Sequence, residues 1–185
     1  MSSPCDPKYA SVGDVGAALM VVDSRIKALH SGTTADDPEH RALVEQYVAS
    51  LGPEGADALL DGACTLIYMF MRWLRVVHED LGKDVMEYVV PTLVATMRMM
   101  PKTFRPEVIP TMAALVIAAG TDLSPSLWRQ QYGEWTEPEL NALEATTVLL
   151  AEHINRVAGD TDFATRMVSE AISRMEEDGE EDDQG

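Results

Sequence analysis

The chain has 185 residues, which favours a single domain, and its 46% hydrophobic and 24% charged residues are typical of a globular protein. Its net charge of −17 argues against binding to nucleic acid or to an anionic membrane surface, because both need a basic face. Seven acids lie in the segment 176–183, and the part before it still carries 24 acids against 14 bases. Solubility, an acidic proteome or a salt-adapted host would explain this charge. Docking on a basic protein or mimicry of nucleic acid is the functional alternative.

The N-terminal region is expected to consist of a flexible segment, 1–13, followed by two helices. The pattern predicts the first helix over 14–30, just before a glycine that can adopt the left-handed cap conformation. The second helix is predicted over 37–51, where Asp37 offers an N-cap.

A third helix is predicted over 53–81 and would be the long central helix of the domain. Gly62 is a plausible break within it. Its densest apolar block, TLIYMFMRWLRVVHED, runs for roughly nine residues before Arg72, well short of the ~20 that a bilayer requires. We therefore expect the buried spine of a helical bundle rather than a membrane span.

One narrow polar line runs along this third helix, because its polar residues step by three and four. The line consists of Asp61, Thr65, Tyr68, Arg72, Arg75 and Glu79. It could be the solvent-facing edge of a mostly buried helix. It could also face an internal groove in which Tyr68, Arg72 and Arg75 bind a small acidic ligand.

Two proline-containing segments in the middle of the chain resemble each other. They read VVPTLVA over 89–95 and VIPTMAA over 108–114, with the prolines 19 positions apart. Because proline suits the first turn of a helix and disrupts its interior, the pattern predicts two packed helices with similar entry geometry.

A short helix from Ser124 to Gly133 carries most of an aromatic cluster formed by Trp128, Tyr132 and Trp135. Two of the three tryptophans of the chain lie here. The cluster is interpreted either as a lid packed on the core or as a contact for a partner or ligand.

The clearest helix begins with the predicted capping box of Thr136 and Glu139 and ends at Gly159. A last helix is predicted to end at Met175, followed by an acidic disordered tail, 176–185. No segment has a strand pattern that competes with the helical periodicity. The predicted fold is therefore all-α, with a single helical domain over 14–175 that contains seven or eight helices as a bundle or orthogonal array.

The search for catalytic chemistry is largely negative. The sequence has no phosphate-binding loop, no H-E-x-x-H and no G-x-S-x-G motif, and its four histidines are scattered. We therefore expect no metal and no cofactor, and assign no catalytic residue. Whether the protein is an enzyme stays open, although the pattern favours a non-catalytic protein.

The two cysteines, Cys5 and Cys64, are too few for a disulfide framework, and the N-terminus lacks the pattern of a signal peptide, which favours the cytoplasm. The leading hypothesis is a non-catalytic cytoplasmic protein that acts by binding another protein or itself, as an adaptor, a regulator or a homo-oligomer. The alternative is a helical sensor that binds a small molecule in a groove along 61–79. An enzyme without a recognisable motif and an acidic decoy of a basic protein are less favoured.

Overall fold

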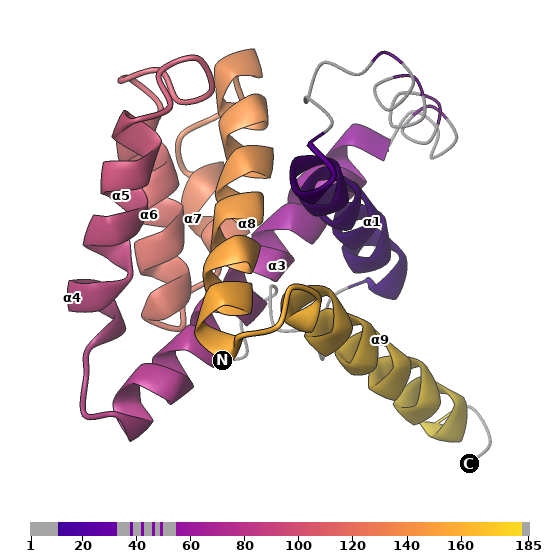
Figure 1. Cartoon of the computed structure of the whole chain (residues 1–185). Coiled ribbons are helices and arrows are strands. Elements are labelled where there is room, and N and C mark those ends of the chain that lie inside the picture. Colours follow the sequence, from indigo (N-terminus) through magenta and orange to yellow (C-terminus); the bar gives the residue numbers. More distant parts are fainter. Residues whose placement is uncertain are drawn as a thin grey trace.

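The computed structural model describes residues 11–32 and 55–182, together with the isolated helical positions 38, 42, 46 and 49. In this part the regular structure consists of helices alone, which confirms the all-α class. In chain order these helices are α1 (Val12–His30), α3 (Gly55–Asp80), α4 (Val85–Tyr88), α5 (Val90–Arg98), α6 (Ile109–Gly120), α7 (Pro125–Gln130), α8 (Glu137–Ala158) and α9 (Phe163–Asp182) (Figure 1).

Two predictions fall wholly or partly outside the described residues. The helix expected over 37–51 lies outside them, apart from the four isolated positions. The segment expected to be flexible, 1–13, is described only at its end, where α1 begins at Val12. Its last two residues are therefore helical.

Helix α3 packs against α1, α4, α6, α7, α8 and α9. Its side chains Leu66, Phe70 and Leu74 are fully buried. The helix continues for 26 residues without a break, so the break considered at Gly62 is wrong. Gly62 lies instead against α1, where a Cβ atom on it would be 2.2 Å from the carbonyl oxygen of Asp14. The glycine is needed because two helix backbones approach closely at this point.

The prolines and caps begin and end helices as the sequence predicts. Pro91 and Pro110 stand in the first turns of α5 and α6, which pack against each other. Thr136 and Glu139 form the capping box of α8, and Gly159 ends that helix with a left-handed φ of 70°. These features are local in sequence, which is why the pattern alone locates them.

Helix α9 corrects the predicted tail. It passes the expected end at Met175 and continues through the acidic run to Asp182. Residues 176–182 are thus helical, and the expectation of disorder is wrong for them. Extending an existing helix costs much less than starting one, and glutamate is a good helix former. In Figure 1 this end of α9 points away from the other helices.

None of the described helices combines the length and the apolar character needed to cross a bilayer.

Candidate functional site

The polar line of α3 does not face a single environment. Asp61, Arg72 and Glu79 are exposed, and Arg75 is half-buried. Thr65 and Tyr68 are buried. The line is therefore neither a continuous solvent edge nor a continuous groove, because its middle points into the protein.

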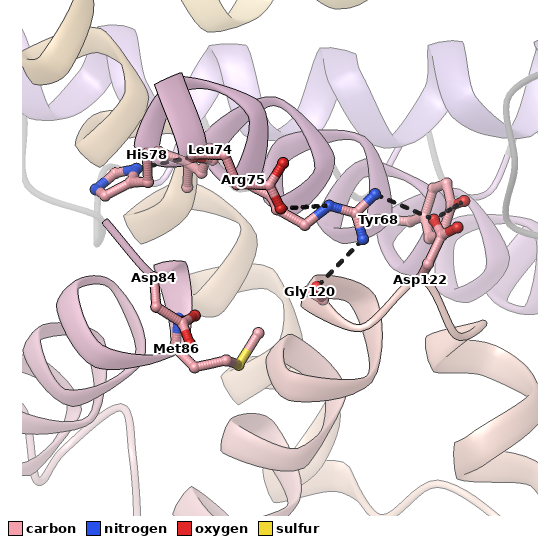
Figure 2. A network of polar contacts seen from close by, with 9 residues as sticks. Tyr68, Leu74, Arg75, His78, Asp84, Met86, Gly120 and Asp122 are labelled. Carbon is pink, nitrogen blue, oxygen red and sulfur yellow. Dashed lines mark hydrogen bonds and ion pairs between the residues drawn. The ribbon is translucent and has the colours of Figure 1, made fainter. Parts of the chain in front are cut away.

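Tyr68 and Arg75 connect α3 to the turn that follows α6. The Tyr68 phenol donates a hydrogen bond of 2.7 Å to Oδ1 of Asp122. Nη2 of Arg75 lies 3.8 Å from the same carboxylate oxygen, and Nη1 of Arg75 donates to the carbonyl oxygen of Gly120 at 3.4 Å (Figure 2). Asp122 adopts a φ of 65°, the one positive value at a non-glycine residue in the described part of the chain. These contacts hold the α6–α7 turn against α3.

An open cleft of about 580 Å³ lies beside Arg75, between the end of α3, the start of α4 and the end of α6. It is lined by Arg75, Glu79, Gly82, Lys83, Asp84, Val85, Met86, Gly120 and Thr121. The cleft thus contains two cations and two carboxylates. The Arg75 guanidinium also lies 4.0 Å from Glu79, so the protein's own carboxylates already balance its charge. An acidic ligand at Arg75 would therefore compete with Glu79 and Asp122.

The first residue of the polar line belongs to an acidic group at the α1–α3 contact. Although Asp61 is exposed as a whole, partial burial of its carboxyl group raises its pKa, and the negative charges of Asp14 and Asp57 raise it further. Protonation of Asp61 therefore begins at a higher pH than for an ordinary aspartate.

The aromatic cluster lies at the link between α7 and α8. The rings of Trp128 and Tyr132 are 4.8 Å apart between centroids. Trp128 and Trp135 are partly buried and pack against the core, whereas Tyr132 is 65% exposed. The two tryptophans thus serve as a lid on the core, and Tyr132 alone of the three is presented at the surface.

Arg129 organises this link, although sequence reasoning did not select it. It is 3% exposed and its guanidinium lies 4.7 Å from the centre of the Trp135 ring. It donates to the carbonyl oxygens of Gly133 and Glu134 at 2.8 Å each, and to Oε2 of Glu139 at 2.6 Å. No pattern in a single sequence marks an arginine whose acceptors are spread over the following turn and helix.

The pKa of Glu139 reflects the same contacts. Burial acts to raise it, but the backbone N–H of Thr136 and the guanidinium of Arg129 outweigh burial and lower it. Its carboxylate accepts from Thr136 N at 2.9 Å. One charged oxygen therefore serves both the capping box and the buried arginine.

The described histidines do not converge on a metal site. Among the described residues, no group of three or more His, Cys, Asp or Glu side chains could hold a metal ion. Burial lowers the pKa of His153, and the nearby charges of Arg156 and His78 lower it further. His153 lines a small hollow of about 40 Å³ between α5 and α8.

A longer depression runs along the contact between α1 and α8, and we call it the α1–α8 groove. Its first hollow has a volume of about 210 Å³ and a mostly apolar surface. It is lined by Ala18, Val21, Val22, Leu59, Leu60, Ala63, Leu140, Asn141, Leu143, Glu144 and Thr147. Leu140, in the first turns of α8, is left 40% exposed at this position.

The second hollow of the α1–α8 groove has a volume of about 350 Å³. It is lined by Arg25, Ala28, Leu29, Met100, Lys102, Thr103, Asn141, Glu144, Ala145, Val148, Leu149 and Glu152. The small side chains of Ala28 and Ala145 contribute depth, because neither fills the space between the two helices. Sequence reasoning missed this groove, since it depends on the packing of α1 against a helix more than 100 residues away in the chain.

One ion pair and one histidine–carboxylate contact join the helices across the groove. Nε of Arg25 donates to Oε1 of Glu144 at 2.5 Å, and Nε2 of His30 lies 3.0 Å from Oε1 of Glu152. Residue numbers rise together along α1 and α8 at these contacts. Glu144 and Asn141 line both hollows, so the Arg25–Glu144 pair lies where the two hollows adjoin.

Comparison of the chain with protein-family models, with curated proteins and with solved structures finds no match.

Proposed function

We propose that this protein is a non-catalytic cytoplasmic binding protein that accommodates an amphipathic helix of another protein in the α1–α8 groove. The observation that carries this proposal is a pair of adjoining hollows, about 210 and 350 Å³ in volume, along the side of two neighbouring helices. The first is mostly apolar, and the second combines apolar side chains with charged ones. Adjoining hollows with apolar side chains suit a partner that presents several apolar anchors from one face.

The spacing of the hollows supports a helical partner. On α1 the lining residues run from Ala18 to Leu29, which corresponds to roughly 17 Å along the helix axis at 1.5 Å per residue. This is about three helical turns. A partner helix laid alongside would place apolar residues at i, i+3 or i+4, and i+7 opposite the two hollows.

The test uses a synthetic helical peptide of about three turns with leucines at i, i+4 and i+7 and polar residues elsewhere. Its scrambled counterpart has the same composition without an apolar face. Binding is measured by fluorescence anisotropy. We expect the amphipathic peptide to bind and the scrambled peptide to bind at least about tenfold more weakly, because only the first presents its anchors together.

Two variants locate the binding. Ala145→Arg and Ala28→Arg each place a long charged side chain in the second hollow, from α8 and from α1. Ala158→Arg is the matched control, because Ala158 is exposed at the end of α8 and lies outside the groove. Loss of binding in the first two variants alone supports the proposal. Equal binding by all three, with unchanged helical content, contradicts it.

The cleft beside Arg75 favours a second candidate function, the recognition of a small carboxylate-bearing ligand. Its volume of about 580 Å³ falls in the range of ligand sites, and Arg75 and Lys83 both line it. A thermal-shift titration with succinate and with glutamate tests this function. If the cleft binds such a ligand, the melting temperature of the wild type rises, and that of Lys83→Gln rises less. If neither ligand raises the melting temperature of the wild type, this function is rejected.

A further inference from the structure

Glu144 lines both hollows, which places the charged Arg25–Glu144 pair where they adjoin and beside a helix bound along the groove. Both side chains are about one-third exposed, at 31% and 32%. Arg25 holds Oε1 of Glu144. A carboxylate has a second oxygen that can accept hydrogen bonds, so Glu144 can bind a further cation without releasing Arg25.

The charge of the whole protein favours a cationic partner. The chain carries a net charge of −17, and a field of this sign attracts basic molecules and speeds their association. The same charge opposes the packing of a second copy of this chain against the groove, since two copies repel each other. The second hollow itself is lined by two glutamates of α8, Glu144 and Glu152, and by two cations, Arg25 and Lys102, so the preference for a cation comes from the overall charge and from Glu144.

We propose that the partner helix is basic, and that a lysine or arginine between its apolar anchors contacts Glu144. The inference rests on the proposed function, because it concerns the same groove. Glu144 is then the residue that determines specificity within the groove. The hollows provide the contact area, and the carboxylate where they adjoin selects a cation at one position of the partner.

Three peptides test this inference. They share the leucine anchors of the amphipathic peptide described above and differ at one position between the anchors, which is lysine, glutamine or glutamate. For the wild-type protein we expect the lysine peptide to bind about three- to fivefold more tightly than the glutamine peptide, the range of a partly exposed ion pair. The glutamate peptide is expected to bind most weakly.

Glu144→Gln is expected to abolish the difference between the lysine and glutamine peptides. Glu137→Gln is the matched control, since Glu137 is an exposed glutamate of the same helix outside the groove. The control changes the net charge equally and should keep the preference. Arg25→Gln, which leaves Glu144 in place, is expected to retain or increase the preference for lysine. It provides a second test if Glu144→Gln lowers stability.

The outcomes separate the two proposals. If all three peptides bind equally and Ala145→Arg still abolishes binding, the groove binds a helix but Glu144 does not select its charge. A preference for lysine that persists in Glu144→Gln also overturns the inference, because the overall field then accounts for it. If no peptide binds the wild type, both proposals fail. Sedimentation of the protein as a dimer that dissociates in Ala145→Arg would assign the groove to self-association and overturn both.

Discussion

Gly62 is a residue at which α3 approaches α1 closely. An added Cβ atom would lie 2.2 Å from the carbonyl oxygen of Asp14 and 2.9 Å from Cβ of Ala18. Backbone cannot yield as a flexible side chain would, so the two helices would have to separate. Ala18 also lines the first hollow, which connects this contact to the shape of the groove.

We therefore predict that Gly62→Ala lowers the free energy of unfolding by about 1–3 kcal/mol, the usual cost of overpacking. Gly16→Ala is the control, because no heavy atom lies within 4 Å of its added Cβ. It should stabilise α1 by about 0.5–1 kcal/mol through helix propensity. Urea denaturation measures both variants. Equal stability of the two variants would contradict this account of the α1–α3 contact.

We expect His153 to make the free energy of unfolding depend on pH, and this contribution can be measured separately. Its pKa in the folded state is lowered by burial and by Arg156 and His78, so the unfolded chain binds a proton more readily. The stability linked to neutral His153 is fully present above pH 6.5, its ordinary pKa, and is lost as the pH falls through the lower folded pKa.

Between pH 7.5 and 5.5 we expect the free energy of unfolding to fall less in His153→Gln than in the wild type. Urea denaturation at each pH measures this difference. Arg156→Gln should reduce the fall without abolishing it, because burial is the larger cause. A His153→Gln protein that keeps the full slope would show that other groups cause it.

At the scale of elements, the link between α7 and α8 depends on Arg129. Its guanidinium donates hydrogen bonds to two carbonyl oxygens of the link and to the carboxylate of Glu139, which caps α8. It therefore fixes the start of α8, and with it Leu140 and Asn141 at the first hollow. The aromatic residues Trp128 and Trp135 pack around this link and cover the core.

We predict that Arg129→Ala destabilises the protein by about 3 kcal/mol or more, since it leaves two carbonyl oxygens without their donor and the largely buried Glu139 carboxylate without its cation. Arg129→Lys should be intermediate, because an ammonium group cannot reproduce the planar fork. Arg98→Ala, at an exposed arginine, should change stability by less than about 0.5 kcal/mol. Thermal unfolding monitored by tryptophan fluorescence compares them, and similar losses for Arg129 and Arg98 would refute the role given to Arg129.

At the scale of the whole molecule, local signals in the sequence locate the elements and non-local contacts create the site. The prolines of α5 and α6 and the capping box of Thr136 and Glu139 act within one turn, so the sequence predicts them. Arg25 and Glu144 are separated by 119 positions, and their pairing depends on the packing of α1 against α8. No periodicity in one chain contains that information.

The polar line of α3 illustrates the same limit. Its spacing correctly places Tyr68 and Arg75 on one side of a helix, but their environments are decided by Asp122 and Gly120 from another element. The choice between solvent and groove therefore could not be made from the helix alone. The predicted end of the last helix was wrong for a different reason. The prediction gave the charge of residues 176–182 more weight than their helix propensity.

A methyl NMR titration of the 185-residue chain with the lysine peptide tests directly whether the α1–α8 groove binds a helix. Binding in the groove predicts saturable shifts at Ala28, Ala145 and Leu149, and unchanged signals at Leu127 on the exposed surface of α7. Shifts confined to α7, or no shifts at peptide concentrations in the millimolar range, would contradict it.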